Sequence, residues 1–258
     1  MPESLRITVL GSGTSSGVPT IGCGCATCAS TDPRDNRLRP SVLMQYAGKN
    51  VLIDTTPDFR TQALRAGIAR VDAILYTHAH ADHILGLDDL RPLTFTTSGK
   101  IPLYAQPSAM GRIREMFSYI FGGEYKYGGI AQVELNPLNG PLELHGACFE
   151  PIAIMHGDAE ICGFRFGSAA YVTDFSEIPE RSMARLSGLD ILILDALRHK
   201  PHPTHSTVAN SLALIERLQP RRAYFTHISH DLGHERTNAT LPENVRLSHD
   251  GLKLEFEL

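Results

Sequence analysis

The stretch Tyr76-Thr77-His78-Ala79-His80-Ala81-Asp82-His83 decides the fold, because it gathers three histidines and one aspartate directly after the apolar run Val71 to Leu75. In an extended segment His78, His80 and Asp82 point to one face, and a turn then brings His83 alongside them. Imidazole and carboxylate groups suit zinc, manganese or iron. A metal site needs further ligands elsewhere in the chain, whereas the alternative, a polar surface loop rich in histidine, does not.

Further candidate ligands follow, each at the end of an apolar run with the pattern of a strand. The run Phe149 to Met155 ends in His156, Ala169 to Thr173 ends in Asp174, and Arg222 to Thr226 ends in His227. A strand delivers the side chain that follows it to the rim of a sheet. The sequence therefore predicts that remote residues complete a metal site.

In their order, these residues resemble the signature of the metallo-β-lactamase superfamily, HxHxDH followed by a later His, a later Asp and a final His. The matching residues are His78, His80, Asp82, His83, His156, Asp174 and His227. The resemblance implies an α/β fold, the four-layer αββα sandwich, and a single hydrolase domain over residues 1–258. It also implies two divalent cations, zinc or manganese, in the active site.

The resemblance assigns the ligands of each cation. One ion is expected on His78, His80 and His156, the other on Asp82, His83 and His227, with Asp174 between them. Two cations about 3.5 to 4 Å apart share a water and lower its pKa. The implied nucleophile is a hydroxide that bridges the two cations, and Asp82 and His205 are the expected catalytic residues.

A second group of ligands lies near the amino terminus, in Gly22-Cys23-Gly24-Cys25-Ala26-Thr27-Cys28. Close cysteine spacing without a secretory signal favours structural zinc over a disulfide, because cytosolic thiols stay reduced. Three thiolates need a fourth ligand, and His230, three residues beyond His227, is the natural choice. The alternatives are a redox pair or three unrelated cysteines. Cys148 and Cys162 lie in strand-like surroundings and are expected to be small core residues.

The cysteine loop resembles one branch of the superfamily, the phosphodiesterases of phosphonate catabolism that open phosphoribosyl 1,2-cyclic phosphate. Their extra zinc site of three Cys and one His implies zinc on Cys23, Cys25, Cys28 and His230. In His202-Pro203-Thr204-His205-Ser206, His205 lies where this branch and the transfer-RNA 3′-processing endonucleases have a catalytic histidine. Its implied role is to protonate the leaving oxygen or to hold a phosphate oxygen. The alternative is an incidental histidine near a helix cap at Ser206.

Composition agrees with this interpretation. The chain has 258 residues, 42% hydrophobic and 20% charged, as expected for a soluble globule. The net charge of −4 disfavours a protein that mainly grips a long polyanion, so nucleic acid is an unlikely partner. Arg34, Arg37 and Arg39 are expected on a solvated face. With neither a signal peptide nor a membrane-spanning run, we expect a cytoplasmic protein without membrane contact.

Three classes of function compete. The first is a metal-dependent phosphodiesterase for a small cyclic or nucleotide-like phosphodiester, which in this family is often a homodimer. The second is a transfer-RNA 3′-processing endonuclease, disfavoured because no glycine-rich, basic arm lies between Asp174 and His227. The third is another hydrolase of the superfamily, for a thioester or lactam, or a metal-binding protein without turnover. The cysteine loop disfavours a lactamase.

Local patterns predict the elements that support the site. Strands are expected at residues 6–10, 41–46, 50–54, 101–105, 191–194 and 224–227. Helices are expected at about 57–66, 84–90, 108–120 and 206–218. Asp54 is expected to be a buried acid that supports the ligand loops. Gly67 is predicted to end the first helix, Pro92 to stop the second, and Ser108 to cap the third. Gly251 predicts a final hairpin.

Two further segments carry hypotheses. Gly11 to Gly17 lacks the glycine spacing of a dinucleotide-binding loop, so we interpret it as a donor-rich wall whose Ser15 and Ser16 touch phosphate. Residues 110–139 are rich in aromatic side chains around Gly122 and Gly123. They are consistent with a lid, a dimer interface or core packing.

Overall fold

The alternation of side chains along the strands builds two sheets that are buried on both faces. The computed structural model describes residues 4–95, 99–123 and 129–257. In the strand Ile191–Asp195, Ile191 and Ile193 pack between the sheets, and Leu192 and Leu194 pack under the helices. Because both faces of such a strand are apolar, each sheet needs a sheet on one side and helices on the other. This is the αββα sandwich predicted from the sequence.

In the described part of the chain, each sheet has seven strands. The first, in spatial order, contains β14 (Lys253–Glu257), β1 (Ser4–Gly11), β2 (Ser41–Tyr46), β3 (Lys49–Ile53), β4 (Ala73–Leu75), β5 (Ile101–Ala105) and β6 (Val133–Pro137). The second contains β13 (Val245–Leu247), β12 (Arg222–Thr226), β11 (Ile191–Asp195), β10 (Ala169–Val172), β9 (Ala159–Phe166), β8 (Ala147–His156) and β7 (Leu142–Leu144).

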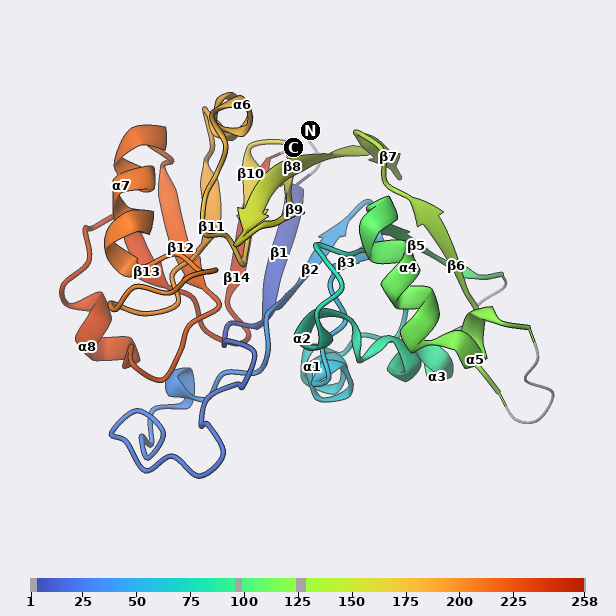
Figure 1. Cartoon of the computed structure of the whole chain (residues 1–258), viewed down its shortest axis with the longest axis horizontal. Coiled ribbons are helices and arrows are strands. Elements are labelled where there is room, and N and C mark those ends of the chain that lie inside the picture. Colours follow the sequence, from blue (N-terminus) through green and yellow to red (C-terminus); the bar gives the residue numbers. More distant parts are fainter. Residues whose placement is uncertain (1–3, 96–98, 124–128, 258) are drawn as a thin grey trace.

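The helices cover the two outer faces (Figure 1). Beside the first sheet lie α1 (Phe59–Ala66), α2 (Ala81–Ile84), α3 (Arg91–Thr94), α4 (Pro107–Met116) and α5 (Ser118–Phe121). Beside the second lie α6 (Glu180–Met183), α7 (Val208–Leu218) and α8 (His234–Asn238). Short 3-10 turns occupy Pro33–Asp35, Leu87–Leu90 and Ala184–Leu186.

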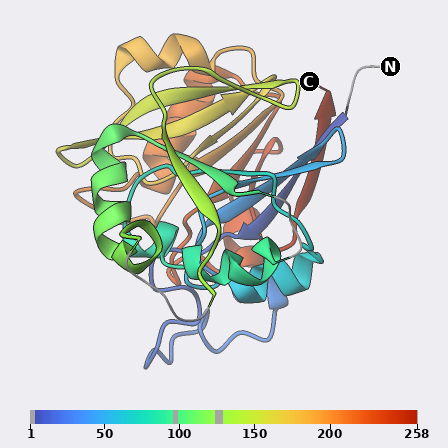
Figure 2. The same ribbon diagram turned by 90° about the vertical axis from the view of Figure 1, so that its right-hand side faces the viewer.

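Parallel pairing positions the site. β10, β11 and β12 run parallel to one another in the second sheet, and β3, β4 and β5 do so in the first. The carboxyl ends of parallel strands meet at one edge of a sheet, where α/β proteins place their ligands. The segment between β1 and β2, which contains the cysteines, extends as a blue loop below the sheets in Figures 1 and 2.

The helices differ from the prediction in several places. The predicted helix 84–90 is not one helix, because α2 ends at Ile84 and a separate 3-10 turn covers Leu87–Leu90. Pro92 does not stop a helix, because it occupies the first turn of α3, where its missing N–H costs nothing. Likewise α4 begins with Pro107 and not with a cap at Ser108. The predicted helix 108–120 breaks at Phe117, which separates α4 from α5. The first helix ends as predicted, with Gly67 in the left-handed conformation.

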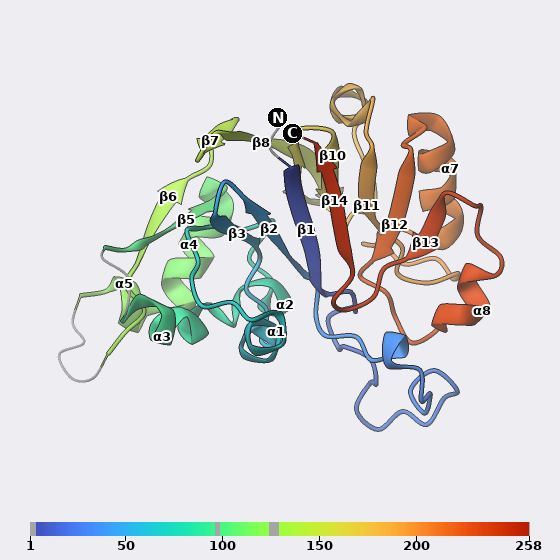
Figure 3. The ribbon, with the colours of Figure 1, turned by 180° about the vertical axis from the view of Figure 1, so that it is seen from behind.

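The predicted carboxyl-terminal hairpin is wrong. Gly251 has the positive φ of a turn, +89°, but the strands on either side of it join different sheets. β13 pairs with β12 in the second sheet, and β14 pairs with β1 in the first, as Figure 3 shows for the red and dark blue strands. Local turn chemistry predicts a reversal of direction but not the partner of each strand.

Three side-chain environments also differ from expectation. Arg37 is 1% exposed and not on a solvated face; its guanidinium is bonded to Asp35 and to three backbone carbonyls. Cys148 is exposed, against the core position predicted for it. Cys162 is buried as predicted. Burial of a charged group is tolerated where its hydrogen bonds are satisfied, which residue type alone does not reveal.

The aromatic segment 110–139 is partly core. Phe117 and Ile120 are buried beneath the first sheet with α4, whereas Tyr119 is 41% exposed. Tyr125 and Tyr127 lie outside the described residues. Core packing therefore accounts for the buried residues of this segment but not for Met116 and Tyr119, which are 42% and 41% exposed. The lid and the dimer interface stay predictions.

Within the described residues, no helix has the length and apolarity needed to cross a bilayer.

Candidate metal centre

The sandwich brings all seven predicted ligands of the two-metal site into two groups. Their donor atoms lie within 4.8 Å of one another in each group. The first consists of His78, His80 and His156, and the second of Asp82, His83, Asp174 and His227. Most ligands stand at strand ends: His78 shortly after β4, His156 at the end of β8, Asp174 after β10 and His227 after β12.

The first group is a cluster of three imidazoles. The ring centroids of His78 and His80 lie 4.5 Å apart, and those of His80 and His156 lie 5.0 Å apart. Nδ1 of His156 donates to the carbonyl of Thr204 at 2.8 Å. Fixing one ring nitrogen in this way leaves Nε2 as the free donor atom, as in metal-binding histidines.

Asp174 links the two groups. Its Oδ2 atom lies 3.9 Å from Nε2 of His78 in the first group. In the second group the same oxygen lies 3.4 Å from Nε2 of His83 and 3.3 Å from Nε2 of His227. Asp82 completes this group, 3.4 Å from His83 and 3.6 Å from His227. Asp174 therefore holds the position between the groups that a bridging ligand requires.

Backbone strain accompanies these positions. Asp174 and His227 have φ of +58° and +56°, a conformation that costs a non-glycine residue about 1 to 3 kcal/mol. Each of the two residues follows a parallel strand. Because its backbone is left-handed, its side chain points in a different direction from the one it would have if the strand continued. Such strain concentrates at functional sites.

Asp54 supports the histidine-rich loop, as predicted for a buried acid at this position. It is fully buried and accepts hydrogen bonds from the backbone N–H of Thr77 at 2.9 Å and from the Thr77 hydroxyl at 2.8 Å. Nδ1 of His83 lies 2.7 Å from its second oxygen. The carboxylate thus fixes the ring of His83 with Nε2 directed to the metal centre.

His205 is held by a residue that the sequence prediction missed. Its Nδ1 atom lies 2.9 Å from Oδ2 of Asp195, the last residue of β11, which is fully buried. The ring of His205 lies 4.6 Å from that of His227 and 4.9 Å from that of His156, centroid to centroid. His205 therefore lies between the two ligand groups. An acid at the end of the apolar run Ile191–Leu194 was the available signal.

The donor atoms fit divalent cations. Nε2 of His78, His83 and His227 are buried without a hydrogen-bond partner, a state that costs free energy unless another group satisfies it. Burial lowers the pKa of His78 well below its usual value, so its imidazole is in the neutral form that binds metals. Burial opposes the charged form of His227 too, but the carboxylates of Asp174, Asp82 and Asp195 raise its pKa to about 9. Nitrogen and oxygen donors of this kind suit zinc and manganese.

The four predicted ligands of the structural zinc also come together. Sγ atoms of Cys23, Cys25 and Cys28 surround Nδ1 of His230 at 3.1, 3.5 and 3.5 Å. The backbone N–H of Cys28, and then its other cysteine neighbours, hold the pKa of Cys25 at about 6, which favours the thiolate. Three thiolates and one imidazole form a closed set of four, typical of structural zinc.

Buried Arg37 fixes the position of His230 against the cysteine loop. Its guanidinium donates to the carbonyls of Ser229 at 3.0 Å and Leu232 at 2.7 Å, on either side of His230. Asp35 neutralises it at 2.8 Å. These two hydrogen bonds from Arg37 therefore join the segment between β1 and β2 to the segment that carries His230, in addition to the sulfur cluster.

The metal centre opens on one side into a small cavity of about 220 Å³. The three histidines of the first group line it, together with Gln106, Ser108 and Arg112 near the start of α4 and Glu160 of β9. Ser15 and Ser16 are exposed and belong to a loop that pairs beside His227, through Gly13 and Ile228. Their predicted contact with phosphate stays a prediction.

The fold and the two nitrogen- and oxygen-rich donor groups define a metal-dependent hydrolase of the metallo-β-lactamase type. A family model described as the β-lactamase superfamily domain matches residues 49–228, and the chain belongs to that superfamily. A crystal structure of a diphosphatase from the PhnP family is 60% identical, covers 100% of this chain and 99% of its own, and has a TM-score of 0.95. The chain is therefore also a member of the PhnP family.

The curated relatives include enzymes with two different activities. An octanoyltransferase of Porphyromonas gingivalis is 37% identical over 254 residues, which are 96% of this chain and 51% of that protein. A ribonuclease Z of Bradyrhizobium diazoefficiens is 28% identical over 151 residues, 54% of this chain and 47% of that protein. The chain thus spans about half the length of the curated relatives that it matches.

Proposed function

We propose that the protein is a phosphodiesterase for a small cyclic or nucleotide-like phosphodiester, such as a ribosyl 1,2-cyclic phosphate. One observation carries this proposal: a histidine held by a buried carboxylate, His205 on Asp195, faces a two-group metal-ligand cluster. Cleavage of a phosphodiester needs positive charge at the phosphoryl oxygens and a proton for the leaving oxygen. The cluster and His205 would supply these separately.

The first cation would be held by His78, His80 and His156, and the second by Asp82, His83 and His227, with Asp174 shared. Zinc or manganese bound there would supply positive charge for the phosphoryl group and acidify water. Asp82, predicted as catalytic, acts in this proposal through its carboxylate in the second group. Asp54 and the carbonyl of Thr204 orient the histidines.

His205 acts as the general acid. With Nδ1 bonded to Asp195, the Nε2 edge of the ring is the one available to a substrate, and the side chain is 12% exposed. Water adds its oxygen to phosphorus while the ester bond to the leaving oxygen breaks. His205 donates its Nε2 proton to that oxygen, and the proton lost by water restores the histidine afterwards.

The opening of the metal centre suits a small substrate. The cavity has a volume of about 220 Å³. Arg112, whose guanidinium lies 3.6 Å from Glu115, offers a cation to a second anionic group on the substrate. Gln106 and Ser108 line the same cavity and add hydrogen-bonding groups. The relationship to a diphosphatase agrees with a substrate that carries more than one charge.

A transfer-RNA 3′-processing endonuclease is the second candidate, because ribonuclease Z relatives match about half of the chain. The region between Asp174 and His227 contains α6, a 3-10 turn, β11, α7 and β12 with their connecting loops, without an extended basic arm. We do not assign octanoyl transfer to this chain, because about half of the octanoyltransferase lies outside the match.

The test is a substrate panel with metal-reconstituted protein. It contains a ribose 1,2-cyclic phosphate, bis(4-nitrophenyl) phosphate, a nucleoside diphosphate ester, a precursor transfer RNA and a β-lactam. The proposal predicts turnover of the small phosphodiesters only. Turnover of precursor transfer RNA with a higher kcat/KM than any small diester would replace it with the endonuclease.

We further propose that residues 1–258 act as one hydrolase domain, because the ligands come from both sheets. His78 follows β4 of the first sheet, whereas His156, Asp174 and His227 belong to the second. The homodimer and the cytoplasmic location stay predictions, and light scattering after size-exclusion chromatography tests the former.

A further inference from the structure

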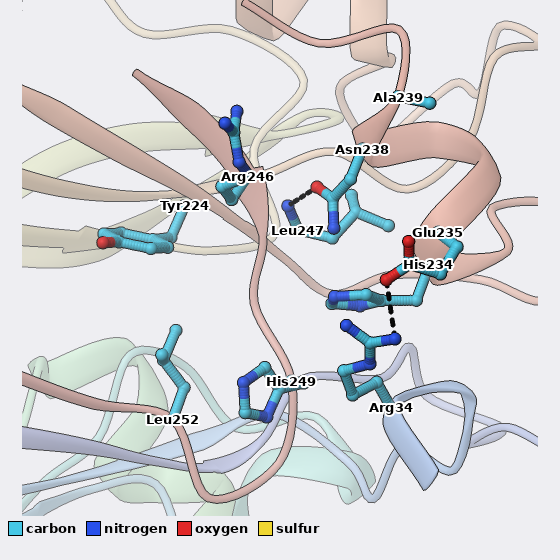
Figure 4. A pocket seen from close by; sticks show the side chains of 10 residues that line it. All are labelled: Arg34, Tyr224, His234, Glu235, Asn238, Ala239, Arg246, Leu247, His249 and Leu252. Atoms are coloured by element: carbon cyan, nitrogen blue, oxygen red, sulfur yellow. Dashed lines mark hydrogen bonds and ion pairs between the residues drawn. The ribbon is translucent and has the colours of Figure 1, made fainter. Parts of the chain in front are cut away.

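We propose that a second pocket, at the edge of the sandwich, binds a small flat aromatic anion. The pocket has a volume of about 460 Å³ and lies between α8, β13 and the turn that precedes β14 (Figure 4). This volume is within the range of small-molecule sites. No residue of its lining belongs to either predicted metal site, so a ligand here would not compete with the substrate.

A buried histidine is the first argument. His234, the first residue of α8, is 4% exposed, and its ring points toward the middle of the pocket (Figure 4). Its Nδ1 atom is buried without a hydrogen-bond partner. A buried polar atom left without a partner costs about 1 to 3 kcal/mol. A ligand oxygen near this edge of the ring would provide the missing partner.

The charge of the lining is the second argument. The lining contains two arginines, Arg34 and Arg246, and one acid, Glu235, which lies 2.6 Å from Arg34. Arg34 also pairs with Asp32 at 2.8 Å. The guanidinium of Arg246 donates to the backbone carbonyls of Pro242 and Val245, and within the described residues no carboxylate pairs with it. Arg246 therefore keeps an uncompensated positive charge at the pocket. A carboxylate or phosphate is the group that a guanidinium binds best.

The remaining wall is apolar and aromatic. Tyr224 and Leu252 line the side opposite His234, and Leu247 lies next to Asn238 (Figure 4). Leu247 is buried, and the other two are partly buried. The ring of Tyr224 and the two leucines offer an apolar contact surface, which favours an aromatic ring over a hydrated polar group as the part of the ligand that lies there.

A polar group fixes the orientation of such a ligand. Oδ1 of Asn238 accepts the backbone N–H of Leu247 at 2.8 Å, so the amide orientation is set and Nδ2 remains as a donor. Together, the lining offers a cation, a neutral imidazole, an amide donor and an apolar face. This combination defines a negatively charged aromatic molecule, either a carboxylate or a phosphate.

The experiment titrates the metal-loaded protein with 4-fluorobenzoate, followed by fluorine NMR. The expected dissociation constant is about 1 mM or lower, which corresponds to roughly 4 kcal/mol of binding free energy. Arg246→Gln should weaken binding about tenfold. The matched control is Arg236→Gln: Arg236 is an exposed arginine of α8 that does not line the pocket, and its removal should change the dissociation constant less than twofold.

Further experiments locate the binding site and identify the acidic group of the ligand. Leu252→Trp should block the pocket and abolish binding. Phenyl phosphate and benzoate are then compared as competitors. If phenyl phosphate competes more strongly in wild type but not in Arg246→Gln, the pocket is assigned to aryl phosphates. If benzoate competes more strongly in wild type but not in Arg246→Gln, it is assigned to aryl carboxylates. Equal binding by Arg246→Gln and Arg236→Gln, or no saturation below about 10 mM, would overturn the proposal.

Discussion

The buried cluster at the strand ends and the cysteine cluster near the amino terminus both gather metal-binding side chains, but from different kinds of structure. The ligands of the buried cluster come from both sheets, and their positions depend on the packing of the whole sandwich. The cysteine cluster draws three ligands from one loop and one from the segment after β12. Its surroundings are half-buried and contain no candidate catalytic group.

This difference indicates that the buried cluster serves catalysis and that the cysteine cluster serves stability. Orphaned imidazole nitrogens, strained backbone and a carboxylate-held histidine are found in the buried cluster. In the cysteine cluster all four ligand atoms already approach one another, as in a closed structural site. His230 follows His227 by three residues, so the second cluster anchors the segment that carries a ligand of the first.

The largest expected effect is that of His205→Ala on turnover. Loss of a general acid should lower kcat about 10²- to 10⁴-fold, with the metal content unchanged, as measured by steady-state kinetics and elemental analysis. His199→Ala, which removes an exposed histidine nearby, is the control and should retain wild-type kcat. A loss of metal from His205→Ala would make His205 a ligand and not an acid.

Asp195→Asn should have a smaller effect on the same step. The amide keeps the shape of the carboxylate but no longer stabilises a protonated ring, so we expect kcat to fall about 10- to 100-fold. An unchanged kcat in a variant with an intact fold would remove Asp195 from the catalytic arrangement.

Cys25→Ser should act on stability more than on chemistry. We expect the loss of one zinc ion per chain and a lower Tm, since metal binding contributes to folding free energy. Any fall in kcat should be smaller than for His205→Ala. Cys148→Ser is the matched control, because Cys148 is exposed and distant in sequence from the loop, and it should leave Tm unchanged.

The smallest expected effect is a pH dependence of stability beside the cysteine loop. Burial, with the charges of Arg34, Arg37 and His249, lowers the pKa of His234 from 6.5 to about 4, against the opposing charge of Asp32. Asp35 accepts the backbone N–H of His234. The unfolded chain therefore binds a proton between pH 6.5 and 4 that the folded chain does not, and acid favours unfolding in that window.

At pH 5 this histidine should lower the free energy of unfolding by at most about 2 kcal/mol relative to pH 7.5. Denaturant unfolding of wild type and His234→Gln at both pH values measures the effect. The variant should lose less stability on acidification than wild type does. An equal loss in both proteins would show that His234 is not the group responsible.

The sequence predicted ligands better than the residues that orient them. His78 to His83 are adjacent in the chain, and His156, Asp174 and His227 follow strands that the apolar pattern makes visible. Asp195 also ends an apolar run, but without a neighbouring histidine in sequence its role depends on the pairing of β11 between β10 and β12. The carbonyl of Thr204 carries no sequence signal at all.

The wrong predictions share a physical cause, which is that local pattern does not specify tertiary environment. Gly251 permits a turn, yet the edges of two different sheets decide where β13 and β14 pair. Arg37 is buried because Asp35 and three backbone carbonyls satisfy its hydrogen bonds. Cys148 occupies an outward position of β8, whereas Cys162 occupies an inward one of β9.

Metal counting is the most direct test of two separate ion sites, one catalytic and one structural. Elemental analysis of the purified protein should give about three ions per chain in wild type. Asp174→Ala should lose the two active-site ions and keep one zinc, whereas Cys25→Ser should lose one zinc and keep the other two. The same metal content in all three proteins would contradict the assignment of these residues as ligands.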